Sequence, residues 1–179
     1  MNSYKLKFTM LEQDIIQLLA LRSGEKFSQR EIAKILTVSP TAISKSIPKL
    51  EKSTLITVEK TNITHYVSYN TFNKQAIELK RVQNLRIIYT SGLKEFLCEH
   101  LAGSTIIVFG SFSKGEDTKD SDIDIAIIGR KPKKIPLEKY ELKTFRKINL
   151  NFYKSWNDIH IHLKNNILQG FVLHGSVQL

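Results

Sequence analysis

The spacing of apolar side chains divides the first part of the chain into short helices. Leu11, Ile15, Leu18 and Leu19 lie on one helical stripe, which predicts a helix over residues 11–21. Ser28 and Glu31 form a capping box, so a second helix is expected to begin at about Gln29 and to end near Leu36.

A third helix and a hairpin are predicted next. Ser39 is a good N-cap and Pro40 suits the first helical position, so a helix should cover residues 41–52. Its inward positions are Ile43, Ile47 and Leu50. Residues 55–70 then read as two strands joined at residues 60–62.

Apolar residues at helical spacing predict a helix or a helix pair over residues 71–101, with a break at Gly92. These residues are Ile77, Val82, Leu85, Ile88, Tyr89, Leu93, Phe96, Leu97 and Leu101. We expect a domain boundary near Thr71.

Residues 105–109, "TIIVF", form a short continuous apolar run, as in a strand buried on both faces. Gly110-Ser111 ends this strand, and a polar stretch with Gly115 leads to "SDIDIAIIG" at residues 121–129. Residues two apart in a strand share a face, so Asp122 and Asp124 should point the same way, while Ile123, Ile125 and Ile127 should point into the opposite layer.

Two carboxylates this close repel unless a cation lies between them. Carboxylate oxygens suit Mg²⁺, which commonly takes one or two protein carboxylates together with substrate phosphates. Gly110 allows a close approach of the backbone to a ligand, and the amides after it, with the Ser111 hydroxyl, can face phosphate oxygens. The stretch therefore predicts a site for a metal-bound nucleotide.

Two registers compete for the strand after the next helix. In "INLNFY", residues 148–153, Asn149, Asn151 and Tyr153 alternate with apolar residues. In "DIHIHL", residues 158–163, a strand would place Asp158, His160 and His162 on one face. The first register is preferred, because residues 156–167 also fit a helical stripe; His160 and His162 are then surface residues.

Composition adds a net charge of +10 over 179 residues, shared along the chain, which favours polyanionic partners such as DNA, RNA or nucleotides. Cys98 is the only cysteine, so no internal disulfide and no cysteine-based zinc site are expected. No apolar run is long enough for a membrane helix, and no signal peptide is visible, so a cytoplasmic location and no membrane partner are the default expectation.

Two short helices across a tight turn, followed by a hairpin, resemble a winged helix-turn-helix over about residues 8–70. The resemblance implies duplex DNA binding by the outward face of the third helix and by the wing tip. The expected DNA-binding residues are Thr41, Ser44, Lys45, Lys49 and Lys60. The alternative is a winged helix used only for protein contacts or dimerisation.

Gly110, Ser111, Gly115, Asp122 and Asp124 resemble the signature of the DNA polymerase beta-type nucleotidyltransferases, over about residues 104–175. The resemblance implies a nucleoside triphosphate substrate, Mg²⁺ or Mn²⁺ on Asp122 and Asp124, which are also the expected catalytic residues, and nucleotide contacts from Gly110, Ser111, Lys114 and Ser121. Lys114 departs from the family's usual arginine. The family places a third acid on the next strand, where this chain has Asn149 or Asn151, unless the alternative register supplies Asp158.

The expected fold class is α+β, with three parts: a winged helix-turn-helix at 1–70, connecting helices at 71–103, and a small mixed-sheet nucleotidyltransferase domain flanked by helices at 104–179. The expected function is metal-dependent transfer of a nucleoside monophosphate to a hydroxyl acceptor. The resemblance to minimal nucleotidyltransferases, many of them prokaryotic, leaves two alternatives open. One is a catalytically degenerate DNA-binding regulator, and the other is an antitoxin-like subunit with a toxin or other protein partner. Both readings are compatible with a homodimer.

Overall fold

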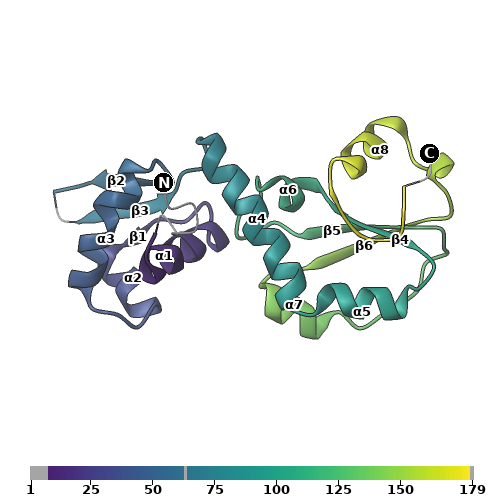
Figure 1. Cartoon of the computed structure of the whole chain (residues 1–179), viewed down its shortest axis with the longest axis horizontal. Helices are drawn as coiled ribbons and strands as arrows, with labels where there is room; N and C mark the ends of the chain where they lie inside the picture. Colours follow the sequence, from purple (N-terminus) through teal and green to yellow (C-terminus); the bar gives the residue numbers. More distant parts are fainter. Residues whose placement is uncertain (1–7, 63, 178–179) are drawn as a thin grey trace, which may run out of the picture. The chain divides into compact units, whose positions relative to one another are not determined.

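The structure of the protein is a computed structural model, which describes residues 8–62 and 64–177. The chain forms two compact units, Met1–Lys80 and Arg81–Leu179 (Figure 1). No helix in the described part of the chain has both the length and the apolar character needed to cross a membrane.

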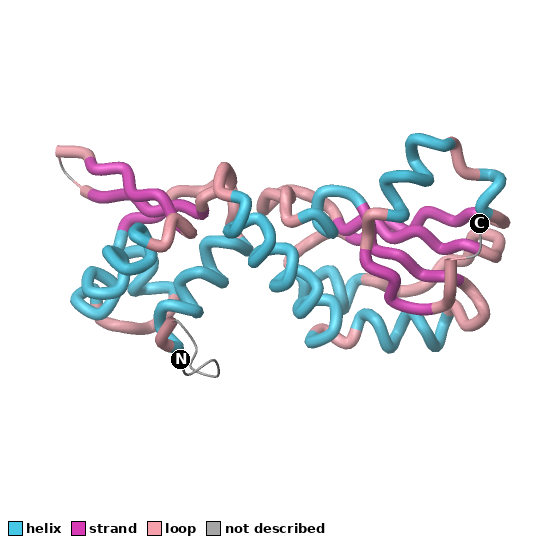
Figure 2. The backbone as a smooth tube through the Cα atoms, turned by 45° about the horizontal axis from the view of Figure 1, so that its top comes forward, coloured by secondary structure: helices cyan, strands magenta, loops and turns pink. Residues whose placement is uncertain are grey.

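The first unit has winged-helix topology. Its elements are α1 (Met10–Leu21), β1 (Phe27–Ser28), α2 (Gln29–Ile35), α3 (Pro40–Lys52), β2 (Ile56–Lys60) and β3 (His65–Tyr69). The strands form an antiparallel sheet in the order β1-β3-β2, and β2 with β3 forms the wing (Figure 2). The three helices and the hairpin confirm the predicted elements, whereas the two-residue strand β1 was not predicted.

The helix starts follow from their caps. The predicted capping box of Ser28 and Glu31 is present, and Ser39 caps α3 with Pro40 in its first turn. α1 has a second capping box, in which the Thr9 hydroxyl accepts from the Glu12 amide and the Glu12 carboxylate accepts from the Thr9 amide. These side chains satisfy amides that have no partner inside the helix, so each helix begins at a defined residue.

A single apolar cluster fills the first unit. Ile43, Ile47 and Leu50 of α3 are buried in it, as predicted, against Ile15 and Leu19 of α1. Pro48 lies inside α3 on the exposed face, and the helix continues to Lys52. The face of α3 opposite its buried residues Ile43, Ile47 and Leu50 is therefore exposed and can contact a ligand.

The predicted helix pair is confirmed as α4 (Lys74–Thr90) and α5 (Leu93–His100). Gly92 separates them in the left-handed region, at φ +78°. Not all of the apolar positions face a core: Val82 is 65% exposed and Tyr89 is 45% exposed.

The second unit is built on a mixed four-stranded sheet in the order β6-β5-β4-β7. Its elements after α5 are β4 (Thr105–Phe109), α6 (Gly110–Lys114), β5 (Ile123–Ile128), α7 (Glu138–Thr144), β6 (Ile148–Tyr153), the 3₁₀ helix η1 (Trp156–Asp158), α8 (Ile161–Leu168) and β7 (Phe171–His174). β5 runs parallel to β6, while β4 is antiparallel to both β5 and β7.

The two faces of this sheet pack against different helices. Ile123, Ile125 and Ile127 share a core with residues of α4 and α5, whereas Ala126 and Ile128 pack with Trp156, Ile159 and Ile167, the last of them in α8. Figure 1 shows α8 on the opposite side of the sheet from α5 and α7. The period of two in β5 thus sends Ile123, Ile125 and Ile127 to one layer, and Asp124, Ala126 and Ile128 to the other.

The secondary structure of residues 148–168 decides between the two sequence interpretations of the strand that follows α7. Residues 148–153 form β6 and pair with β5, as preferred. The alternative strand over residues 158–163 is wrong, because Trp156–Asp158 form a 3₁₀ turn and Ile161–Leu168 form a helix.

Candidate functional site

The candidate active site is a pair of carboxylates bridged by an amide. Asp122 immediately precedes β5. Asp124 is the second residue of β5 and pairs with Asn149 of the parallel strand β6. The Asn149 amide nitrogen Nδ2 donates to Asp122 Oδ2 at 3.1 Å and to Asp124 Oδ1 at 3.3 Å. Asn149 therefore lies where a third acid would meet the two aspartates, as one of the sequence hypotheses stated.

Gly110 brings the end of β4 against the same carboxylates. Its φ is +76°, and a Cβ atom there would lie 3.0 Å from Asp124 Oδ2. Phe109, the last residue of β4, pairs with Asp124. Only glycine provides both this backbone conformation and this approach at low cost, so the Gly110-Ser111 turn and the aspartates belong to one site.

The other predicted nucleotide-binding residues flank this turn. Ser111 and Lys114 are partly exposed in α6, which ends at Gly115 with φ +76°. Ser121 has a local role as well, because its hydroxyl accepts a hydrogen bond from the Thr118 amide at 2.9 Å. Ser121 thus shapes the turn that delivers the chain to Asp122.

A buried polar network connects the segments next to the site, and it was not predicted from the sequence. Asn84 of α4 donates through Nδ2 to the Phe112 carbonyl at 2.8 Å and to Asp117 Oδ1 at 2.7 Å. Arg146 donates to Asp117 Oδ2 at 3.3 Å, and both side chains are nearly fully buried. The network joins α4 and α6 to the loop before β5 and to the segment before β6, so it connects segments that adjoin the candidate site residues.

Tyr153 lies at the far end of β6. Burial raises the pKa of its hydroxyl, and the negative charge of Asp124 raises it further. The phenol therefore stays protonated well above neutral pH.

Asp158 follows β6 beyond the same end as Tyr153, in the 3₁₀ helix η1, and stabilises the turn there. Its carboxylate accepts from the Ser155 amide at 3.0 Å. Because β6 advances by about 3.3 Å per residue from Asn149 to Tyr153, about 13 Å separates the two ends of this segment. Asp158 is thus not the third acid. His160 and His162 are exposed, as expected for surface residues.

The candidate metal ligands are the carboxylates of Asp122 and Asp124. Within residues 8–62 and 64–177, no three His, Cys, Asp or Glu side chains are grouped so that they could hold a metal ion. Two carboxylates fit a single Mg²⁺ or Mn²⁺ that arrives with triphosphate oxygens, since such ions need few protein ligands.

The candidate nucleic-acid interface lies on the first unit. The predicted residues Thr41, Ser44, Lys45 and Lys60 are exposed. Thr41 and Ser44 line a groove of about 480 Å³ between α2, α3 and β3, together with Arg30 and His65. Arg30 was not singled out in the sequence, because its place beside α3 depends on the packing of α2.

The fifth predicted residue, Lys49, is also exposed, but it forms an ion pair with Glu12 of α1. Its Nζ lies 2.7 Å from Glu12 Oε2, and the Glu12 side chain is only 7% exposed. Burial, the largest influence, acts to raise the pKa of Glu12, but hydrogen bonds from Lys49 and from the Thr9 backbone together hold it below its usual value. Lys49 consequently stabilises α1 against α3.

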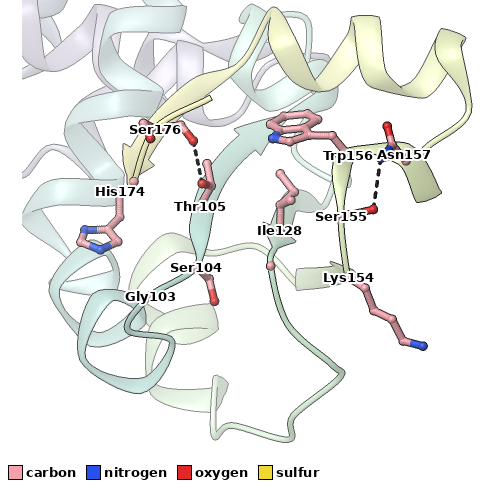
Figure 3. A pocket seen from close by; sticks show the side chains of 12 residues that line it. Gly103, Ser104, Thr105, Ile128, Lys154, Ser155, Trp156, Asn157, His174 and Ser176 are labelled. Atoms are coloured by element: carbon pink, nitrogen blue, oxygen red, sulfur yellow. Dashed lines mark hydrogen bonds between the residues drawn. The ribbon is translucent and has the colours of Figure 1, made fainter. Parts of the chain in front are cut away.

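A larger cavity, of about 530 Å³, lies at the end of the sheet away from the aspartates. Figure 3 shows Thr105 hydrogen-bonded to Ser176 and Ser155 to Asn157, while Lys154 and His174 extend away from each other. Its polar groups thus serve the surrounding turns, and its two basic side chains do not converge on one ligand position.

Comparison with known families agrees with the geometry of the second unit. Residues 91–176 match the family model of the nucleotidyltransferase domain, and this stretch contains Gly110, Ser111, both aspartates and Asn149. The chain thus carries a nucleotidyltransferase domain next to a winged helix. No curated protein matches the sequence.

Among solved structures, a double mutant of Lactococcus lactis ZitR is 20% identical, with a TM-score of 0.41, over 55% of this chain and 66% of that one, just under two thirds. ZitR in complex with DNA is 22% identical, with a TM-score of 0.41, over 56% and 66%. The adhesin competence repressor AdcR from Streptococcus pyogenes is 18% identical, with a TM-score of 0.41, over 56% and 72%. The winged helix of the first unit is defined by its own topology.

Proposed function

We propose that this protein binds duplex DNA through its winged helix and a nucleoside triphosphate through its nucleotidyltransferase unit, and that it transfers nucleoside monophosphate to a hydroxyl acceptor only slowly. The observation that supports slow transfer is the amide of Asn149 beside both Asp122 and Asp124. An amide is a poor proton acceptor and carries no charge.

The nucleotide half of the proposal follows from the donor set. Asp122 and Asp124 would hold Mg²⁺ or Mn²⁺, which supplies charge neutralisation of the triphosphate when bound. Gly110 leaves room for phosphate oxygens at the backbone, and the Ser111 hydroxyl and Lys114 ammonium can bind them. A lysine neutralises phosphate without the two-pronged geometry of arginine.

Acceptor activation is the step that these residues serve poorly. General-base assistance is typically worth about 10²–10⁴-fold in rate. Asn149 cannot remove the acceptor's proton, and Asp158 is bound to the Ser155 amide at the opposite end of β6. Binding of the triphosphate therefore survives while turnover falls.

The DNA half of the proposal rests on the exposed face of α3. Thr41 and Ser44 offer hydroxyls toward a major groove, while Lys45 and Lys60 offer cations for phosphates. Arg30 adds a cation at the rim of the protein groove that Thr41 and Ser44 line. Lys49 is expected to contribute less than Lys45, because leaving Glu12 would strand a buried carboxylate.

Calorimetric titration with nucleoside triphosphate and Mg²⁺ tests the nucleotide site. The wild type should bind, and the variant Asp122→Ala with Asp124→Ala should lose the Mg²⁺-dependent part of the affinity. Asp158→Asn is the matched control, since it alters an acid outside the site. Equal affinity in wild type and double variant would refute the site.

Transfer of labelled nucleotide to acceptors in a cell extract tests turnover. Robust wild-type transfer that Asp158→Asn abolishes would overturn both the assignment of Asn149 and the slow rate. DNA binding is measured separately by anisotropy of labelled duplex at several salt concentrations. Absence of salt-dependent binding at low ionic strength would refute the DNA half.

A further inference from the structure

A groove of about 440 Å³ lies where α7 ends and β6 begins, next to the candidate active site. Leu142 and Phe145 line it, and they are 77% and 70% exposed. Lys147 lines it as well and is also exposed. The Lys147 carbonyl accepts from the amide of Ile123, the residue between the two aspartates, at 2.8 Å. An apolar surface and a cation therefore adjoin the carboxylate pair.

The backbone of Phe145 is fixed by its neighbours in the chain. Phe145 has φ +54°, a left-handed conformation that bulky residues rarely adopt. Thr144 before it is buried, with its hydroxyl on the Tyr140 carbonyl at 2.8 Å. Arg146 after it is buried and forms the ion pair with Asp117. Two buried neighbours thus hold an exposed aromatic ring in place beside the site.

The chain around this groove is strongly basic. Residues 130–154, from just after β5 to just after β6, contain nine basic side chains and two acidic ones. Lys139 and Lys143 are exposed on α7 at a spacing of four, so they lie on one side of the helix. Of the two acids, Glu141 accepts from the backbone amide at the start of β6 at 3.0 Å, and Glu138 is the first residue of α7. This excess of positive charge fits a polyanion.

We propose that the acceptor hydroxyl is the end of a single-stranded nucleic acid, which stacks a base on Phe145 and places phosphates beside Lys147 and the lysines of α7. The inference rests on the proposed function for the transfer itself. An aromatic ring beside cations binds single strands, because every base has a flat face and every nucleotide has a phosphate. Four residues, at most about 14 Å of chain, separate Phe145 from Asn149, so a strand held in the groove can bring its end to the aspartates.

A single strand supplies what the site and the groove both require. Its terminal hydroxyl oxygen forms the new bond to the α-phosphorus, pyrophosphate leaves with the electron pair of the broken P–O bond, and the hydroxyl proton passes to water. In a duplex the bases are stacked on one another, so their faces are not available to Phe145. An acidic peptide would engage the cations but would leave the rings and methyl groups of the groove exposed.

Anisotropy of a fluorescent single-stranded oligonucleotide with the full chain tests the proposal. Phe145→Ala should weaken strand binding by about fivefold or more, whereas Phe145→Trp should retain it, because stacking depends on the ring. The matched control Phe72→Ala, at a phenylalanine that is 97% exposed in the first unit, should leave it unchanged. Lys147→Ala should lower the salt slope of strand binding by about 0.7, the value for one phosphate contact. Circular dichroism verifies that each variant is folded.

Transfer of labelled nucleotide to the same oligonucleotide tests the assignment of the acceptor. Phe145→Ala should raise the strand concentration needed for half-maximal transfer and leave the triphosphate affinity in calorimetry unchanged. Equal strand binding by wild type, Phe145→Ala and Lys147→Ala, equally strong competition by polyglutamate, or transfer to other hydroxyl acceptors but not to the strand would overturn this inference alone. A wild type without Mg²⁺-dependent triphosphate affinity would instead refute the proposed function.

Discussion

Replacing Asn149 by aspartate converts the bridging amide into a third carboxylate of nearly the same shape. In the wild type, Nδ2 donates to Asp122 at 3.1 Å and to Asp124 at 3.3 Å. In Asn149→Asp, an anionic oxygen takes the place of this donor at similar distances. The substitution therefore replaces two attractive contacts with two repulsive ones, with little change in volume.

The size of the effect follows from these distances. Two unit charges about 4 Å apart repel by about 1 kcal/mol in water, and by more in partly buried surroundings. Two such pairs, with two lost hydrogen bonds to charged groups, should lower the free energy of unfolding by about 2–4 kcal/mol without metal. Mg²⁺ with a triphosphate should reverse the sign of this difference in the free energy of unfolding, because a third carboxylate strengthens the attraction for a cation.

Thermal unfolding with and without Mg²⁺ and triphosphate, alongside labelled transfer, provides the assay. We expect Asn149→Asp to be less stable than wild type without metal, more strongly stabilised by metal and nucleotide, and about 10²-fold or more faster in transfer. Asn151→Asp is the matched control, since Asn151 is on the same face but pairs with Ala126. The reasoning fails if both variants behave alike, or if Asn149→Asp gains neither metal-dependent stability nor rate.

Three further changes have defined outcomes. Gly110→Ala should lower the free energy of unfolding by about 1–2 kcal/mol, because residue 110 has a left-handed backbone. It should also weaken Mg²⁺-dependent nucleotide binding by displacing Asp124. The control Gly103→Ala, with a similar positive φ and open space around it, should leave binding unchanged in calorimetry. Glu12→Gln keeps the cap but loses the charge, so it should lower stability by about 1–2 kcal/mol near neutral pH. Because the pKa of Glu12 is depressed in the fold, this difference should shrink as pH falls through that pKa, and equal losses at all pH values in circular dichroism melts would contradict it. Lys45→Ala should reduce the salt slope of DNA binding by about one unit with little effect on stability, and an unchanged slope would remove Lys45 from the interface.

Elements set by local patterns could be predicted from the sequence. The caps at Ser28 and Ser39 fix helix starts through their own neighbours, and Gly92 ends a helix because it takes a left-handed backbone. The strand before Gly110 and the shared face of the aspartates follow from burial and from the period of two. In each case the decisive contacts lie within a few residues along the chain.

Features that depend on distant partners could not be predicted. Strand β1 has only two residues, which pair with Val67 and Tyr66 of β3. The buried network of Asn84, Asp117 and Arg146 joins residues up to 62 positions apart, and each alone looks like a surface residue. Burial of polar side chains in such networks depends on tertiary packing, which no local pattern encodes.

Lys49 and Asn149 differ in how readily a ligand can displace their present contacts. Lys49 neutralises Glu12, whose side chain is 7% exposed, so moving Lys49 to a phosphate would leave a buried charge without its partner. Asn149 is neutral and exposed, and a cation between Asp122 and Asp124 would replace its two hydrogen bonds with stronger attractions. The arrangement thus disfavours Lys49 as a DNA contact but leaves the carboxylate pair open to a metal-bound triphosphate. It follows that the Asn149 amide should slow transfer without preventing nucleotide binding.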